Sequence, residues 1–402
     1  MILCSIWSAA AMVYDNRYLP LIQYPTIFKL NRPSYLTGDF FITTASRAAD
    51  NGQREIGIPE LSGPFDQAQL ANSMVIAGLP PLLDPAHRNG SLPWMMAGKL
   101  QTQGFAFSYQ QYLGYCVSIG FLGLAMRSNS SIDFFFTSSQ ASNASATPFT
   151  NDQILILDDI RRAMIKSLGL SCNHVSQGGL GDMEAYIRWF RHYDYCFKLR
   201  SLDAGFRFGA LIPTGVKKDP FKPASIPFGG NGHWGIYASA DVEAELKEDW
   251  KVGVLLRASK RFAATSIQRL PVADEPQIFG VLSGPVRITP GFTEIFSLFG
   301  QWEGIRQGLG VRLGYTLINH NKDSWLDERV DKTIPVKLEP VERRSDWASE
   351  YVTLSAFYDL SKVDECSNKP IVRVAWDIPF TLLVGHRFVQ SYKVSLGLEF
   401  NF

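Results

Sequence analysis

The sequence predicts an all-β fold: a transmembrane, antiparallel, up-and-down β-barrel of about 12 strands, with short helices in the long loops of its N-terminal half. Three observations lead to this prediction. Segments of about ten residues alternate apolar and polar side chains along much of the chain, and the connections between them are alternately short and long. The chain also has no run of about 18 apolar residues that would form a membrane-spanning helix. These are the features of a membrane-spanning barrel.

The last segment, YKVSLGLEFNF (392–402), shows the alternation most clearly. Val394, Leu396 and Leu398 fall on one side of an extended chain, and Lys393 and Ser395 fall on the other. Successive side chains of a strand leave the backbone on opposite faces, so a period of two predicts a strand. A soluble β-sandwich would bury the apolar face, whereas a membrane barrel would turn it toward lipid. This strand alone allows both interpretations.

The same alternation recurs in at least ten further segments. It is strongest in GDMEAYIRW (181–189), RSLDAGFRFGA (200–210), HWGIYASADVEAE (233–245) and WKVGVLLRASKR (250–261). Further copies lie at 34–44, 99–109, 115–126, 289–302, 309–318, 350–360 and 371–378. Counted backwards from Phe402, an even set of about 12 strands fits the chain, as a single-chain bacterial barrel requires.

The connections between these segments favour the barrel over the sandwich. Long polar excursions at 213–231, 263–286 and 319–347 alternate with brief turns, as extracellular loops alternate with periplasmic turns. Two longer insertions, 46–96 and 138–179, each contain a helical pattern.

The helices are predicted near 65–78 and near 150–169. Gly78 marks the end of the first, and the second has Asn151 as a candidate N-cap and Gly169 at its end. Each could form a lid or part of a wall, or a plug inside the lumen.

Composition and motifs exclude several functions. Hydrophobic residues make up 46% of the chain and charged residues 19%, which excludes wholesale disorder. A net charge of +1 without a basic tract argues against a nucleic-acid partner. Five scattered cysteines and six histidines form no metal-ligand motif, and no nucleophile elbow or P-loop occurs, so no metal, cofactor or catalytic residue is expected. We therefore expect no enzyme, with a membrane-embedded lipid hydrolase as a remote alternative.

The N-terminus begins with an apolar run, Ile2–Val13, that contains the small residues Ser8–Ala11 but lacks a basic region before it. This pattern favours a clipped or atypical secretion signal spanning residues 1–17, and the alternative is a merely hydrophobic N-terminal segment. Residues 18–402 would then form a single barrel domain that includes both helical insertions.

The polar face of the predicted strands carries charges of both signs. The candidate pore-lining residues are Asp182, Glu184, Arg188, Asp203, Arg207, Asp241, Glu243, Lys251, Arg257, Arg261, Arg312 and Asp377. Opposed acidic and basic rows would create a transverse field across a pore, which orients dipolar solutes and tunes ion selectivity. Alternatively, the charges pair with one another and fill a closed lumen.

The terminal VSLGLEFNF (394–402) resembles the C-terminal assembly signal of Gram-negative outer-membrane β-barrel proteins, with Phe400 and Phe402 at its alternate apolar positions. The resemblance implies recognition by the barrel-assembly machinery and a location among the lipids of the bacterial outer membrane. FRFGALIPTG (206–215) is similar to the strand-to-loop edges of porin-like and hydrophobic-substrate transporters. Neither motif identifies a specific family.

The function expected from these observations is a porin-like channel or transporter for the passive passage of small solutes. The alternative is a structural or adhesin-type barrel that binds a partner through its long surface loops. The sequence specifies neither the solute nor the oligomeric state.

Overall fold

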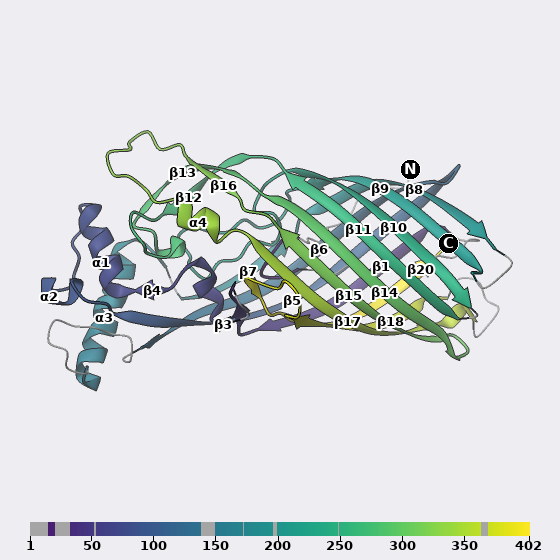
Figure 1. The fold of residues 1–402 in the computed structure, drawn as a ribbon, viewed down its shortest axis with the longest axis horizontal. Coiled ribbons are helices and arrows are strands. Elements are labelled where there is room, and N and C mark those ends of the chain that lie inside the picture. Colours follow the sequence, from purple (N-terminus) through teal and green to yellow (C-terminus); the bar gives the residue numbers. More distant parts are fainter. Residues whose placement is uncertain are drawn as a thin grey trace, which may run out of the picture.

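The computed structural model describes residues 15–20, 33–51, 54–137, 149–171, 173–195, 199–247, 249–362 and 369–402. It forms a closed antiparallel barrel of 12 strands (Figure 1). The wall consists of β1 (Tyr35–Ala45), β5 (Pro93–Gly114), β6 (Val117–Phe136), β8 (Met183–Asp194), β9 (Ser201–Ile212), β10 (Gly235–Lys247), β11 (Trp250–Arg261), β14 (Phe292–Arg306), β15 (Leu309–His320), β17 (Trp347–Asp359), β18 (Ile371–Phe380) and β20 (Tyr392–Asn401). The predicted fold class and strand number are confirmed.

Each wall strand pairs with the next one along the chain, and the last strand closes the barrel against the first. At this seam β1 and β20 run antiparallel in continuous register from Tyr35 opposite Asn401 to Thr44 opposite Tyr392. The wall therefore has no free edge where its backbone groups would lack partners in a bilayer.

The distribution of exposed side chains shows which face of each strand points outward. In β20, Val394 and Leu396 are each 52% exposed, whereas Lys393 and Ser395 are 4% and 3% exposed. The apolar side chains thus cover the outside and the polar ones point into the lumen, the reverse of a soluble β-sandwich. Near the ends of β11 and β14, Trp250 stacks on Trp302 with 5.7 Å between the ring centroids, an arrangement typical of the aromatic girdle at a membrane interface.

The two ends of the barrel differ in their connections, as the sequence predicts. One end has only short turns, such as the β5–β6 hairpin, where Tyr115 and Cys116 both adopt positive φ angles. The C-terminus lies at this turn end (Figure 1). All the long connections gather at the opposite, loop end.

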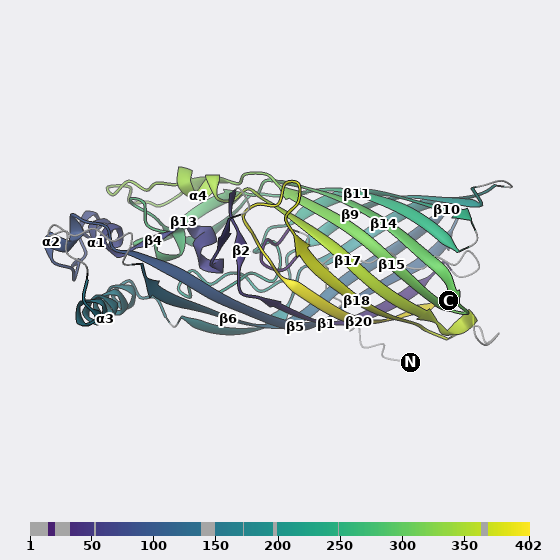
Figure 2. The same cartoon turned by 60° about the horizontal axis from the view of Figure 1, so that its bottom comes forward.

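Helices α1 (Gln67–Ile76) and α3 (Asn151–Ser167) belong to the loop end and stand beyond the barrel wall (Figure 2). Strands β5 and β6, with 22 and 20 residues, are about twice as long as a membrane crossing needs. Their extensions pack against α1 and α3 around a buried cluster that includes Trp94 and Met164. The interpretation of the helices as a plug inside the lumen is wrong, because this cluster holds them outside it.

The predicted positions of both helices are confirmed, with one correction at the start of α3. Thr150, not Asn151, is its N-cap, because the Thr150 hydroxyl accepts a hydrogen bond from the Gln153 backbone and the Gln153 side chain accepts one in return. This reciprocal capping box stabilises the start of a helix more fully than a single cap. Gly78 and Gly169 follow the two helices with φ angles of +73° and +69°, the left-handed conformation that favours glycine.

Short elements complete the loop end and the turns. They are β2 (Ala48–Ala49), β3 (Glu55–Ile56), η2 (Ile58–Ser62), β4 (Phe65–Asp66), α2 (Pro85–Arg88), β7 (His174–Leu180), β12 (Ala264–Leu270), η3 (Gln277–Phe279), β13 (Leu282–Thr289), β16 (Ser324–Asp327), α4 (Glu339–Arg343), η4 (Leu360–Lys362) and β19 (Phe388–Val389). None of the helices in the described part of the chain is long and apolar enough to cross a membrane.

The barrel seam gives a first testable prediction. The Phe402 backbone N–H donates to the Ser34 carbonyl at 3.0 Å, and the Phe402 ring stacks on Tyr109. Removing Asn401 and Phe402 should therefore lower the folded fraction in membranes while leaving the amount of expressed chain unchanged, as measured by the gel shift between unboiled and boiled samples. Phe402→Trp, which keeps an aromatic ring, serves as the control. Normal assembly of the truncated chain would contradict the prediction.

The apolar exterior gives a second prediction. Leu256 lies at the middle of β11 and is 53% exposed on the outer face. Replacing Leu256 by Arg should destabilise the barrel by about 2–4 kcal/mol, since a charge at the bilayer midplane loses its hydration. Ile236 points outward next to the loop end, where the same change should cost about 0–1 kcal/mol. Urea titrations of both variants in lipid vesicles measure the difference, and equal losses would argue against this membrane placement.

Candidate functional site: the charged lumen and its loop-end cavity

The twelve charged residues that the sequence places on the polar face all lie on the inner side of the described wall or at its rim. Seven are buried: Asp182, Glu184, Arg188, Arg257, Arg261, Arg312 and Asp377. Five are half-buried: Asp203, Arg207, Asp241, Glu243 and Lys251. Eleven belong to wall strands, and Asp182 lies in the break between β7 and β8. Their part in conduction stays a prediction.

An almost completely buried ion pair inside the barrel joins β8 to β11. Both carboxylate oxygens of Glu184 accept hydrogen bonds from the Arg257 guanidinium, at 3.0 and 2.7 Å. The side chains are only 1% and 4% exposed. The guanidinium carbon of Arg257 also lies 3.7 Å from the centre of the Tyr237 ring. A bidentate pair with an aromatic neighbour holds both charges in a fixed position.

A second group of charges joins the adjacent strands β8, β9 and β10 on the inner face, closer to the turn end. Arg188 donates to Asp241 at 2.6 Å, and the Arg207 guanidinium lies 3.7 Å from the other oxygen of the same carboxylate. Asp203 accepts from His192 at 2.6 Å if that ring nitrogen is protonated. The basic and acidic rows of the predicted polar face are therefore joined to one another by ion pairs.

Lys251 and Arg312 extend the network around the wall. The Lys251 ammonium lies 3.1 Å from Glu303 and 3.8 Å from Glu243. Arg312 donates to the side-chain oxygen of Gln301 at 2.7 Å.

The opposite side of the wall contains partners that the sequence analysis did not single out. Asp377 pairs with Lys393 at 2.7 Å, and Arg373 pairs with Asp39 at the same distance. The alternation predicts that Lys393 lies on the polar side of the last strand, and the structure confirms its inward direction. Its pairing with Asp377 depends on the β18–β20 register, in which the two residues stand directly opposite each other.

The N-terminal segment Asp15–Pro20 lies in the loop-end mouth of the barrel. Asp15 accepts hydrogen bonds from Arg261 at 2.7 Å and from the Ser259 hydroxyl at 3.2 Å. The Arg17 carbonyl accepts from the Val389 backbone at 3.0 Å. The mouth is therefore narrowed by a segment that precedes the first strand.

The predicted secretion signal ends within this segment. Residues 1–14 lie outside the described residues, so cleavage itself stays a prediction. Cleavage after residue 17 would remove the buried contacts of Asp15, whereas cleavage after the small residues Ser8–Ala11 would keep them. We therefore expect a mature chain that retains Asp15.

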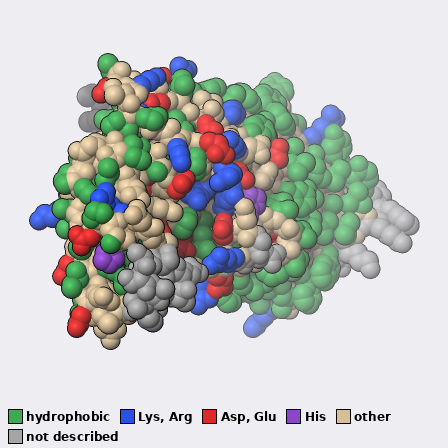
Figure 3. Space-filling model, turned by 60° about the vertical axis from the view of Figure 1, so that its left-hand side comes forward, with side chains coloured by type: hydrophobic (Ala, Val, Ile, Leu, Met, Phe, Trp, Pro, Cys, Tyr) green, Lys and Arg blue, Asp and Glu red, His purple; other side chains and the backbone are tan. Residues whose placement is uncertain are grey.

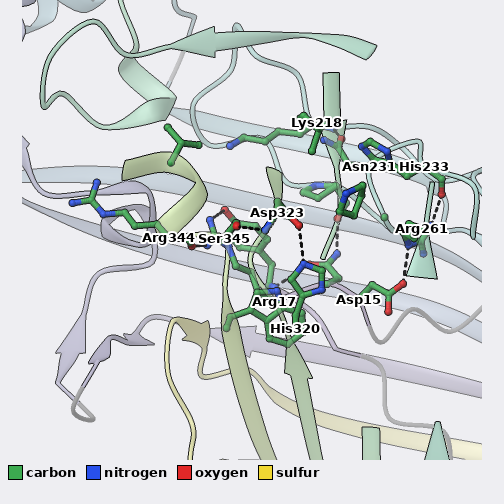
Figure 4. A pocket seen from close by; sticks show the side chains of 18 of the residues that line it. Asp15, Arg17, Lys218, Asn231, His233, Arg261, His320, Asp323, Arg344 and Ser345 are labelled. Atoms are coloured by element: carbon green, nitrogen blue, oxygen red, sulfur yellow. Dashed lines mark hydrogen bonds and ion pairs between the residues drawn. The ribbon is translucent and has the colours of Figure 1, made fainter. Parts of the chain in front are cut away.

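A cavity of about 200 Å³ lies against this segment (Figure 4). Its lining combines the N-terminal segment, the β9–β10 loop, the ends of β11 and β15, the start of β17 and the β16–α4 region. Seen from the loop end, the charged side chains gather near the middle of the face, whereas the barrel side beyond is almost entirely hydrophobic (Figure 3).

The cavity lining has more basic than acidic residues. Arg17, Lys218, Arg261 and Arg344 oppose Asp15 and Asp323, so four positive charges face two negative ones. Asp323 contacts His320 at 3.0 Å, and Asp15 and Asp182 both pair with Arg261.

The excess of positive charge shifts the acidities of the groups in this mouth. Burial alone would raise the pKa of Tyr18, but the charges of Arg17 and Lys218 outweigh it and lower that pKa to about 8. Burial also opposes ionisation of Asp15, yet Arg261 and Arg257 bring its pKa below the usual range. Burial lowers the pKa of Lys218, and the Arg17 charge adds to that effect.

The described residues contain no group of three or more His, Cys, Asp or Glu side chains placed to hold a metal ion. The sequence could not reveal the cavity, because its lining comes from segments up to about 330 residues apart. The Lys218 ammonium has no ion-pair or hydrogen-bond partner among the residues that the structure describes, and this lysine lies in a long loop with no motif to mark it.

Comparisons with solved structures find similarities, among them the following three. An outer membrane channel from Pseudomonas putida F1 is 11% identical, with 95% of this chain and 100% of that chain covered and a TM-score of 0.50. A FadL homologue from Pseudomonas aeruginosa is 11% identical, with 92% and 90% covered and a TM-score of 0.35. The transport unit of the autotransporter AIDA-I from Escherichia coli is 7% identical, with 94% of each chain covered and a TM-score of 0.39.

No protein-family description matches the sequence, and no curated protein matches it. The likeness to the first of these structures shows the fold: a closed barrel of the outer-membrane type. Together with the apolar exterior, it places the chain in the bacterial outer membrane, as predicted.

Proposed function

We propose that this protein is an outer-membrane channel for the passive passage of small solutes. The observation that carries the proposal is the direction of the strand side chains. The charged and polar ones point into the lumen, and the apolar ones cover the outside of the wall. Such an interior offers hydrated solutes a path that the surrounding lipid does not.

The ion pairs and the N-terminal segment limit what this path can admit. The pairs Glu184–Arg257 and Arg188–Asp241 hold charged side chains on the inner face of β8 to β11, and Asp15–Pro20 lies in the mouth. A general diffusion pore keeps its centre open to water, whereas this lumen favours small polar or charged solutes. Paired charges of opposite sign retain a transverse field that would orient a dipolar solute as it passes.

Electrical recording across planar bilayers tests the proposal. The purified full chain should give small, discrete conductance steps, while a boiled sample should give none. If no steps appear at any salt concentration, the lumen is closed and the channel function is wrong.

A second candidate function is partner binding through the loop end. Helices α1 and α3 stand beyond the wall and expose apolar side chains, including Ile76, Leu155 and Ile156. A folded extension of this kind is larger than a simple channel mouth needs. This function becomes the stronger candidate if bilayer recordings show no conductance.

A further inference from the structure

We propose that the loop-end cavity is a binding site for a small organic anion, a carboxylate on a compact, flat apolar body. The cavity presents hydrogen-bond donors that lack an acceptor, next to aromatic side chains. That the bound anion is also transported rests on the proposed channel function. That the cavity binds it does not.

The first line of argument is the set of unsatisfied donors. Arg261 is only 4% exposed, yet its Nη2 has no hydrogen-bond partner among the described residues. The buried indole N–H of Trp325 also lacks one. Buried polar groups are normally hydrogen-bonded, and a buried donor without an acceptor costs free energy. Both residues line the cavity, and an acceptor bound beside them would satisfy these donors.

Lys218 supplies a third donor with a full charge. No acceptor within the described part of the chain forms a hydrogen bond or ion pair with its ammonium group, although its backbone is held by Asn231 at 2.9 Å. Figure 4 shows its side chain extending along the cavity above Arg344 and Ser345. Lys218 is half-buried, and an ammonium group with no counter-ion is stabilised in its charged form when an anion binds beside it.

The local charge agrees with an anion. Four lining residues are basic and two are acidic, and Asp182 is a third carboxylate, which pairs with Arg261 at 2.9 Å, so one positive charge remains in excess. The pKa of Tyr18 agrees with an excess of positive charge, because Arg17 and Lys218 lower it against the effect of burial. A site for a cation would have the opposite balance.

The apolar lining and the size define the rest of the ligand. Trp347 lines the cavity and stacks on His320 with 5.5 Å between the ring centroids. Such flat faces favour a planar apolar group beside the charged one. A volume of about 200 Å³ is smaller than the usual range for drug-sized ligands, roughly 300–1,000 Å³. Benzoate is a probe with this combination of charge, shape and size.

Calorimetric titration of the full chain in detergent tests the site. Benzoate should bind, and its neutral isostere benzamide should bind at least about tenfold more weakly, the usual worth of one charge-assisted hydrogen bond. Lys218→Met should weaken benzoate binding by a similar factor. Lys217→Met is the matched control and should leave binding unchanged, because Lys217 is exposed and does not line the cavity.

The pH dependence of binding gives an independent readout. Arg17 and Lys218 are the charged groups acting on Tyr18, and Ser62 is its uncharged hydrogen-bonding neighbour. A carboxylate stays ionised between about pH 7 and about pH 9, whereas Tyr18 becomes a phenolate across that range and takes the place of the anion. Benzoate affinity should therefore fall as the pH rises, and Tyr18→Phe should retain more of it than the wild type does.

The results separate this inference from the channel function. Binding without conductance would support the site and contradict the channel. Conductance without benzoate binding, in protein whose unboiled sample keeps its faster gel mobility, would overturn the site alone. Equal binding of benzoate and benzamide, or an unchanged affinity in Lys218→Met, would also overturn it.

Discussion

Removing residues 1–20 should raise the single-channel conductance several-fold. The segment Asp15–Pro20 occupies the loop-end mouth and is held there by the ion pair between Asp15 and Arg261, with further bonds to Pro227 and Val389. Without the segment, water can fill the space, and the resistance of that part of the lumen falls.

The comparison requires a control that leaves these contacts in place. A chain that begins at Asp15 keeps the whole contacting segment, so it should conduct like the full chain. Both truncated chains are refolded into detergent from the denatured state, which removes any need for export, and are recorded in the same bilayers. Equal conductance of the chains starting at Asp15 and at Leu21 would show that the segment does not limit the path.

Breaking the pair between Glu184 and Arg257 should have the largest effect on stability. Glu184→Gln removes a charge from a pair that is almost completely buried, and the Arg257 guanidinium loses its bidentate partner. The expected loss of unfolding free energy is about 3–5 kcal/mol, because a buried charge without its partner pays its full desolvation cost.

A double variant distinguishes a lost charge pair from a general packing defect. Glu184→Gln combined with Arg257→Met removes both charges, and it should recover much of the stability that the single change loses. Asp203→Asn, at a half-buried pair near the turn end, should have a small effect. Urea unfolding in lipid vesicles, followed by tryptophan fluorescence, measures all three. A Glu184→Gln variant as stable as the wild type would contradict the buried-pair interpretation.

Most of the barrel wall was predictable because it obeys a local rule. The alternation in the last strand assigns Val394 outward and Lys393 inward, and the structure confirms both. The helix near 150–169 was likewise predictable from its apolar spacing. Each of these features depends on residues within a few positions of one another.

The partners inside the lumen could not be predicted, because they depend on barrel closure and register. Glu184 and Arg257 are 73 residues apart, and two wall strands, β9 and β10, lie between β8 and β11. Asp15 and Arg261 are 246 residues apart, and Asp15 lies in no strand or helix. An amphipathic pattern shows which side chains of a strand point inward. Which of them meet inside the lumen depends on the stagger between strands in the closed barrel.

Solute flux into proteoliposomes is the most direct test of the central claim, that an apolar-walled barrel encloses a narrow polar path. Vesicles containing the full chain should swell in an isosmotic solution of a small amino acid and should not swell in a trisaccharide. Vesicles with boiled protein should respond to neither solute. Swelling in both solutes would show a wide pore, and swelling in neither would show a closed barrel; either result would contradict the account.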